Sequence, residues 1–173
     1  VREALGLSLN VPAVKMLAAV GPGRLTARLD RAGVRTELPP ATVPSLAVAL
    51  GGIGMRLQDL TQLYAAMARG GEPVALTWHG DGAALQTRIA TGKEAFRKRL
   101  LSPVAAWYVS DILKDAPAPL NARGGRLAYK TGTSYGYRDA WSVGFDGRYV
   151  IGVWTGRADG APVPGLAGYV SAA

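Results

Sequence analysis

One stretch of the chain, residues 126–134, has the sequence RLAYKTGTS, and residues 135–141 continue it as YGYRDAW. Large and small side chains alternate on the approach to the lysine, which is typical of a β-strand. We therefore predict a strand over residues 127–134 that carries a lysine, a glycine and several small hydroxyl side chains along one extended segment.

The two faces of this strand are expected to differ. Successive side chains of a strand point to opposite sides, so Lys130 and Gly132 share one face. The hydroxyls of Thr131 and Thr133 share the other face. Gly132 leaves space for another backbone or a ligand to come close. An ammonium group, hydroxyl donors and bare backbone together suit an anionic, peptide-like ligand.

The Lys-Thr-Gly triplet is a weak signal by itself, because three common residues recur by chance and a strand end with a solvated lysine explains them equally well. A second triplet strengthens the signal. Ser8-Leu9-Asn10 lies near the start of the chain, just before a helix that Pro12 opens. A Ser-x-Asn type of triplet followed along the chain by Lys-Thr-Gly is typical of penicillin-binding proteins and serine β-lactamases.

The chain resembles class A penicillin-binding proteins over nearly its whole length. Its start resembles the second-motif region of that family, and the Lys-Thr-Gly strand resembles the third motif. The sequences of residues 135–141 and 162–165 are most similar to those of the 1C type of the family. The segments that carry the resemblance are residues 8–15, 49–54, 59–61, 64–71, 130–134, 139–141 and 144–146.

The chain departs from the family pattern at the nucleophile. The family's attacking serine belongs to a Ser-x-x-Lys motif upstream of Ser-x-Asn, and no serine in this chain has a lysine three positions on. Ser110 comes nearest, with Lys114 four positions away, but it falls within a predicted helix in another region. The resemblance therefore implies that residues 1–173 are the C-terminal part of a transpeptidase domain without its nucleophile, and that they are inactive alone.

The resemblance assigns catalytic roles to Ser8, Asn10 and Lys130. Acyl transfer needs a nucleophile, a base, an oxyanion hole and a proton for the leaving amine. By resemblance, Ser8 relays that proton, Asn10 binds the acyl amide, and Lys130 makes the site positive. Simple helix capping by Ser8 or Asn10 is the alternative interpretation of these two residues.

The resemblance also assigns substrate binding to the residues that follow the lysine, which are Thr131, Gly132, Thr133 and Ser134. The threonine hydroxyls are expected to bind the terminal carboxylate of the donor peptide or of a penicillin, with Thr133 contributing more. The backbone N–H of Thr133 is expected to form an oxyanion hole with that of the missing serine. The substrate backbone is expected to add alongside the strand.

Composition argues against several other chemistries. Cysteine is absent and His79 is the single histidine, so thiolate nucleophiles, cysteine-based zinc sites and a Ser-His-Asp triad are disfavoured, and we expect no metal and no cofactor. The net charge of +8 would attract polyanions, but the basic residues are spread out and no nucleic-acid-binding signature occurs. We therefore predict no nucleic-acid partner and interpret the charge as a solvated surface.

The hydrophobic patterns predict an α/β protein of the α+β type, in which helices flank an antiparallel sheet. The resemblance implies an incomplete penicillin-binding transpeptidase fold, similar to that of serine β-lactamases. Asp146-Gly147 should form the turn between the last two strands. Helices are predicted over residues 12–20, 24–32, 56–69 and 103–115, and strands over residues 127–134, 140–145 and 148–154. Residues 72–101 are expected to be irregular, with residues 74–78 and 83–91 as candidate short strands.

Three of these helices carry specific packing predictions. Tyr64 and Met67 are expected in the core rather than at a ligand. Ser102-Pro103 should cap and open the last helix. After Asp159 the chain is expected to be irregular, with only the start of a closing helix. In the helix over residues 12–20, the side chains expected to point inward are those of Val14, Leu17 and Ala18. In the helix over residues 103–115, they are those of Val104, Trp107, Tyr108 and Ile112.

The function predicted by the resemblance is that of the C-terminal portion of a peptidoglycan D,D-transpeptidase that is acylated by β-lactams. A D,D-carboxypeptidase, a β-lactamase-like hydrolase or a non-catalytic cell-wall-binding module are the alternatives. The partners implied are peptidoglycan stem peptides, β-lactam antibiotics, and the upstream transpeptidase and glycosyltransferase segments of a longer parent chain. The implied location is the periplasmic face of the inner membrane, with an anchor upstream of Val1.

Overall fold

The computed structural model of the protein describes residues 1–74, 99–117 and 127–172. The segment expected to be irregular, with its candidate strands at residues 74–78 and 83–91 and with His79, lies mostly outside the described residues. The helices are α1 (Arg2–Gly6), α2 (Asn10–Val20), α3 (Pro22–Arg31), α4 (Leu57–Ala68) and α6 (Pro103–Leu113), with short helical turns η1 (Leu46–Leu50) and η3 (Gly168–Ala172). The strands are β1 (Thr36–Glu37), β2 (Gly54–Met55), β3 (Ala128–Thr133), β4 (Asp139–Phe145) and β5 (Val150–Gly156).

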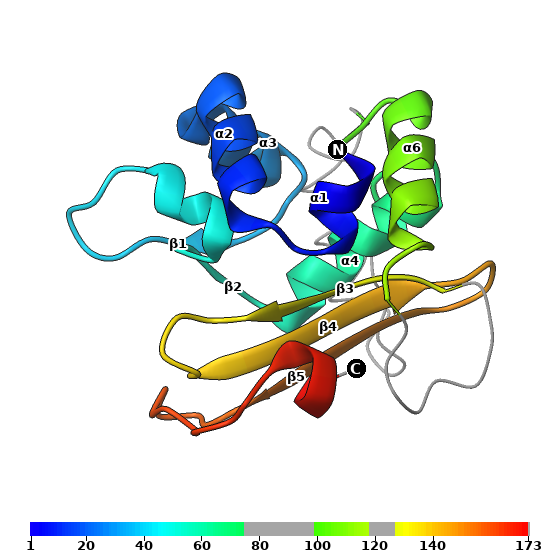
Figure 1. The fold of residues 1–173 in the computed structure, drawn as a ribbon. Helices are drawn as coiled ribbons and strands as arrows, with labels where there is room; N and C mark the ends of the chain where they lie inside the picture. The colour runs from blue at the N-terminus through cyan, green and yellow to red at the C-terminus, as the bar shows by residue number, and fades with distance from the viewer. Residues whose placement is uncertain (75–98, 118–126, 173) are drawn as a thin grey trace, which may run out of the picture.

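A three-stranded antiparallel sheet of order β3-β4-β5 forms one layer, and the helices lie above it (Figure 1). Lys130 pairs with Val143, and Val143 pairs with Gly152 on β5. The predicted meander is therefore confirmed, although β5 begins two residues later than the pattern indicates. The Asp146 carboxylate closes the β4–β5 turn by accepting the backbone N–H groups of Arg148 (2.6 Å) and Tyr149 (2.7 Å). These hydrogen bonds, with the one from Tyr149 dominant, lower the pKa of Asp146.

Helix α4 covers one face of the sheet. Tyr64 of α4 meets Phe145 of β4 edge-on, with 6.3 Å between ring centroids. This pair packs with Met67 around the buried cluster of Leu113 and Ala128, which confirms that Tyr64 and Met67 belong to the core. Burial raises the pKa of Tyr64 to about 12, because the phenolate is poorly solvated there.

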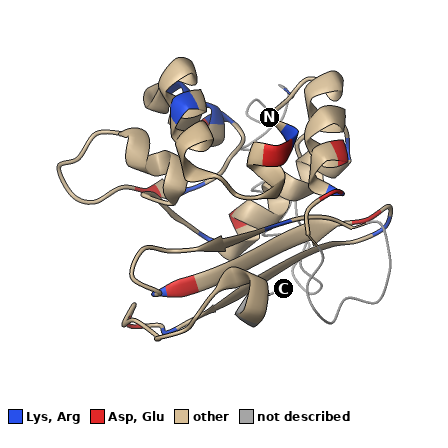
Figure 2. Cartoon of the chain, in the orientation of Figure 1, with Lys and Arg blue, Asp and Glu red and all other residues tan. Residues whose placement is uncertain are grey.

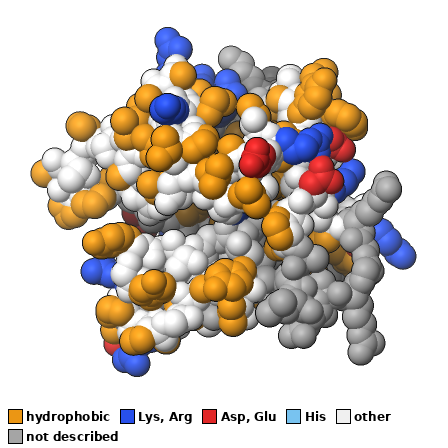
Figure 3. All heavy atoms as spheres, in the orientation of Figure 1, with side chains coloured by type: hydrophobic (Ala, Val, Ile, Leu, Met, Phe, Trp, Pro, Cys, Tyr) orange, Lys and Arg blue, Asp and Glu red, His pale blue; other side chains and the backbone are white. Residues whose placement is uncertain are grey.

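Helix α6 faces the core with a different side from the one predicted. Ser102 caps it as expected, accepting the N–H of Ala105 at 3.1 Å, and Ile112 is buried as expected. The inward placement of the other three side chains is wrong: Val104, Trp107 and Tyr108 are 64%, 60% and 56% exposed. The helix is apolar on nearly every side, so its sequence does not identify the face that packs. Figure 3 shows apolar side chains gathered over α6.

Two smaller features differ from the sequence prediction. In α2, Leu17 is buried and Val14 is half-buried, but Ala18 is exposed, so the predicted stripe is narrower than expected. The two-residue strands β1 and β2 pair with each other, and neither was predicted because such short strands carry no periodic pattern.

The end of α4 gives a testable prediction about stability. Gly71 follows the helix with a positive φ of 90°, and a Cβ there would lie 2.8 Å from the carbonyl carbon of Leu101 and closer still to its oxygen. Gly70 also has a positive φ (68°), but a Cβ there meets nothing within 4 Å. We expect Gly71→Ala to lower the free energy of unfolding by about 2–4 kcal/mol, through backbone strain and overpacking.

Gly70→Ala is the matched control for this prediction. It adds the same methyl group at a positive φ without the clash, so we expect a loss of about 1 kcal/mol. Urea or thermal unfolding measures both variants. Equal losses for the two alanine variants would show that the contact with Leu101 does not constrain Gly71.

Candidate active site

Two side chains that are 122 residues apart along the chain meet at the centre of the candidate site. The ammonium group of Lys130, on β3, donates a hydrogen bond to the hydroxyl oxygen of Ser8, which lies between α1 and α2. The same ammonium group donates to the carbonyl oxygen of Thr131 at 2.8 Å. The Ser8 hydroxyl keeps its own proton for donation elsewhere, because in this contact its oxygen acts only as an acceptor.

Ser8 has an unusual backbone conformation for a serine. It adopts a positive φ of 56° directly after Leu7, the C-cap residue of α1. The N–H of Ser8 binds the carbonyl of Leu5 (3.2 Å) and the N–H of Leu9 binds that of Ala4 (2.9 Å), the pattern of a Schellman C-cap. Glycine is the usual residue at this position because it adopts a positive φ without strain. A serine that occupies it against this preference suggests a role for the hydroxyl.

The helix before Ser8 is tied to α6. The Arg2 guanidinium forms ion pairs with Asp111, at 2.6 Å, and with Asp115. Leu5 packs against the cluster around Leu113. Figure 2 shows basic and acidic positions on α1 and an acidic position on α6, which lie on neighbouring helices. These contacts place the end of α1, and therefore Ser8, over β3 (Figure 1).

Lys130 is half-buried, and this burial disfavours its charged form. Desolvation lowers the pKa of Lys130 from the ordinary value of a lysine. No carboxylate forms an ion pair with it among the residues that the structure describes. Lys130 is thus an ammonium group held by oxygen acceptors, with its remaining N–H available to an anionic ligand.

Asn10 lies two positions beyond Ser8, as the first residue of α2. It is exposed, and its side chain forms no hydrogen bond within the described part of the chain. The residue that caps α2 is Leu9, without a side-chain hydrogen bond, so neither Asn10 nor Ser8 serves α2 as a side-chain cap. The Asn10 side chain is therefore free for a ligand, whereas the Ser8 hydroxyl oxygen is engaged by Lys130 and keeps its own proton for donation.

The threonine hydroxyls lie on the other face of the sheet from Lys130, as the alternation predicts. Thr131 pairs with Ser142 and Thr133 with Ala140 across the β3–β4 ladder. Thr133 is exposed, and its hydroxyl accepts the backbone N–H of Gly168 at 3.0 Å. β3 has a strand partner on one side only among the described residues, so a ligand along its other edge can reach side chains from both faces.

Gly132 and Ser134 differ in their surroundings. A Cβ at Gly132 would meet only the Cβ of Trp141, at 3.8 Å, so the face that it shares with Lys130 is open there. The Ser134 hydroxyl accepts the N–H of Asp139 at 2.9 Å and so holds the turn between β3 and β4. Ser134 directly follows Thr133, and its hydroxyl is engaged in the β3–β4 turn.

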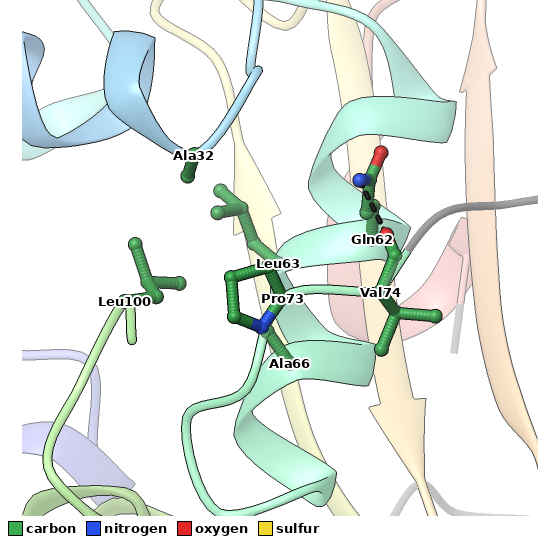
Figure 4. A pocket seen from close by; sticks show the side chains of 7 residues that line it. All are labelled: Ala32, Gln62, Leu63, Ala66, Pro73, Val74 and Leu100. Carbon is green, nitrogen blue, oxygen red and sulfur yellow. Dashed lines mark hydrogen bonds between the residues drawn. The ribbon is translucent and has the colours of Figure 1, made fainter. Parts of the chain in front are cut away.

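A small apolar cavity lies away from these residues, between the end of α3, α4 and the segments at residues 73–74 and 100 (Figure 4). Gln62 is the polar exception in its lining, and its amide donates to the carbonyl of Val74. This lining carries no group suited to acyl transfer. Among the described residues, no group of His, Cys, Asp or Glu is arranged to hold a metal ion, and no helix is both long and apolar enough to cross a membrane.

No protein-family profile matches the chain. Individual relatives do match it. Penicillin-binding protein 1C of Escherichia coli is 44% identical over 98% of this chain, and penicillin-binding protein 1B of Vibrio cholerae is 32% identical over 92% of it. The chain is homologous to one segment of the class A penicillin-binding proteins. It spans about a fifth of the length of these curated relatives, 21% in both cases.

Solved structures of penicillin-binding proteins share the fold. PonA1 of Mycobacterium tuberculosis, solved in complex with penicillin V, superposes with a TM-score of 0.69 over 98% of this chain and 52% of its own, at 20% identity. Penicillin-binding protein 1A of Haemophilus influenzae gives the same TM-score and identity over 97% of this chain and 32% of its own. The fold is that of penicillin-binding transpeptidase domains, which confirms the predicted fold class.

Proposed function

We propose that the chain is the C-terminal part of the transpeptidase domain of a class A penicillin-binding protein that cross-links peptidoglycan by serine acyl transfer. The observation that carries this proposal is the contact between Lys130 and Ser8, which are one residue from each of the two separated motifs. The similarity to penicillin-binding proteins 1C and 1B supports it. The same similarity favours a transpeptidase over a carboxypeptidase or β-lactamase.

In this proposal an upstream segment supplies the nucleophilic serine and its lysine base. The ammonium group of Lys130 stabilises negative charge that develops on Ser8 when Ser8 passes its proton to the leaving nitrogen. Asn10 orients the acyl amide from the exposed start of α2. The donor peptide, or a β-lactam in its place, lies along the free edge of β3 with its carboxylate near Thr131 and Thr133.

The proposed parent protein places this chain in the periplasm, attached to the inner membrane through a segment upstream of Val1. Its partners are then peptidoglycan stem peptides, β-lactams, and the upstream transpeptidase and glycosyltransferase segments. Class A relatives that match the chain support this assignment. The net charge of +8 suits a surface that faces anionic cell-wall and membrane polymers.

A fluorescent penicillin tests the proposal. We expect covalent labelling of the full-length protein and none of residues 1–173 alone, because no serine of this chain has a lysine three positions on. Gel fluorescence after denaturation detects the acyl-enzyme, and prior incubation with unlabelled penicillin is the control for specificity. Labelling of residues 1–173 alone would place the nucleophile within this chain and contradict the division of the site.

A further inference from the structure

The segment after β5 contacts β3, the proposed substrate-binding strand, on the face that carries Thr133. Gly168 donates its backbone N–H to the Thr133 hydroxyl at 3.0 Å. Its α-carbon lies so close to β3 and β4 that an added Cβ would be 2.9 Å from the carbonyl oxygen of Trp141 and 3.0 Å from the backbone nitrogen of Gly132. Gly168 has no positive φ, so close approach alone explains a glycine here.

Two further contacts hold this segment in place. Leu166 is 6% exposed and packs on Ala140, which is fully buried. Ala140 is the residue of β4 that pairs with Thr133 of β3. The N–H of Val163 donates to the carbonyl of Tyr137 in the β3–β4 turn at 2.9 Å. The segment is therefore fixed to the turn, to the sheet face and to the strand, and its N–H at Gly168 has a defined position.

The hydrogen bond from Gly168 constrains what the Thr133 hydroxyl can do. A hydroxyl has one proton to donate and two lone pairs to accept with. Because one lone pair is taken by Gly168, the oxygen is held in one side-chain rotamer, and its proton remains for an acceptor outside the protein. Thr133 is exposed, so that acceptor can be a ligand.

We propose that Gly168 is a positioning residue, whose N–H holds the Thr133 hydroxyl in the rotamer that donates to the carboxylate of a substrate or β-lactam along β3. This inference rests on the proposed function. It assigns to the segment around Gly168 a part in recognising the carboxylate, without any contact between Gly168 and the ligand. An uncharged ester in place of the carboxylate should gain little from this arrangement, since hydrogen bonds to charged acceptors are the stronger ones.

The test measures acylation of the full-length protein by benzylpenicillin and by its methyl ester. We expect Gly168→Ala to slow acylation by the free acid about 10-fold and acylation by the ester less than about 2-fold, because one hydrogen bond to a charged group is weakened. Gly23→Ala is the matched control, because a Cβ at Gly23 in α3 meets nothing within 4 Å, and we expect it to leave both rates unchanged.

Three further substitutions separate positioning from a general loss of structure. In a Thr133→Val background, Gly168→Ala should slow the free acid no further, whereas Thr133→Ser should keep the discrimination between acid and ester. Leu166→Ala loosens the same segment without adding atoms beside Gly132, and it should show the same selective loss if Gly168→Ala does not fold.

The possible outcomes are distinct. Equal slowing of acid and ester by Gly168→Ala, or full additivity with Thr133→Val, would overturn the positioning role while leaving the proposed function intact. Absence of acylation in the unaltered full-length protein would instead contradict the proposed function itself.

Discussion

Replacing Lys130 by methionine in the full-length protein is expected to slow acylation by penicillin about 10²–10³-fold, the range measured when one preorganised electrostatic donor is removed from an acyl-transfer site. The physical reason is that Lys130 is the cation in contact with the Ser8 hydroxyl. Stopped-flow or gel-based acylation rates measure the effect. A rate within about 3-fold of the unaltered protein would remove Lys130 from the proposed mechanism.

Lys130 also gives an expected pH dependence. Burial lowers its pKa, so the ammonium group loses its proton at a lower pH than an exposed lysine does. Acylation that depends on this charge should fall as pH rises through the lowered pKa. Lys130→Arg keeps its charge at all these pH values, so whatever activity it retains should lack this alkaline decline.

The same shift has a consequence for stability. The unfolded chain holds the Lys130 proton more tightly than the folded chain does, because the folded pKa is the lower one. Burial of the ammonium group therefore lowers stability at neutral pH, and this loss shrinks as pH rises through the folded pKa. Lys130→Met should accordingly stabilise the protein more at neutral pH than at alkaline pH, which thermal unfolding at two pH values measures.

Ser8 gives the second large prediction, in which activity and stability change in opposite directions. Ser8→Gly should slow acylation about 10²–10⁴-fold, the usual contribution of a positioned proton-transfer group. It should also raise the free energy of unfolding by up to about 1 kcal/mol, because glycine adopts the positive φ of 56° without strain. Ser8→Ala should lose the same activity without that gain, since alanine retains the strained backbone.

Ser45→Ala is the control for loss of a serine hydroxyl outside the site. Ser45 caps η1 by accepting the N–H of Ala47 at 3.3 Å, so its replacement should reduce stability slightly and leave acylation unchanged. Near-normal acylation by Ser8→Gly would mean that Ser8 serves only the capping turn that ends α1. Acylation rates and thermal unfolding, measured on the same preparations, distinguish these cases.

The sequence predicted those features that follow from local chemistry. Asp146-Gly147 indicated the turn, Ser102-Pro103 indicated the start of α6, and alternation indicated the two faces of β3. The resemblance predicted that Ser8 and Lys130 lie together, and the structure confirms their contact. No local rule could have shown this, because the two residues are far apart along the chain.

Other features could not be predicted for physical reasons. Trp107 and Tyr108 were expected in the core because they are large and apolar, but the packing face of α6 is chosen by neighbours that are distant in sequence. The contact between Gly168 and Thr133 uses a backbone N–H, and every residue except proline carries one. The only sign of this contact in the sequence is the glycine at position 168. Glycine occurs 23 times in the chain, so this position does not stand out.

The 122-residue separation between Ser8 and Lys130 has a thermodynamic consequence. A molecule bound to both Ser8 and Lys130 connects two distant parts of the polypeptide. While it is bound, the two parts cannot separate, and the conformational entropy that separation would give the chain is not gained. Occupancy should therefore slow amide hydrogen exchange in α1 and in β3 together, including at positions that the bound molecule does not touch. Such coupled protection would show that α1 and β3 unfold as one cooperative unit.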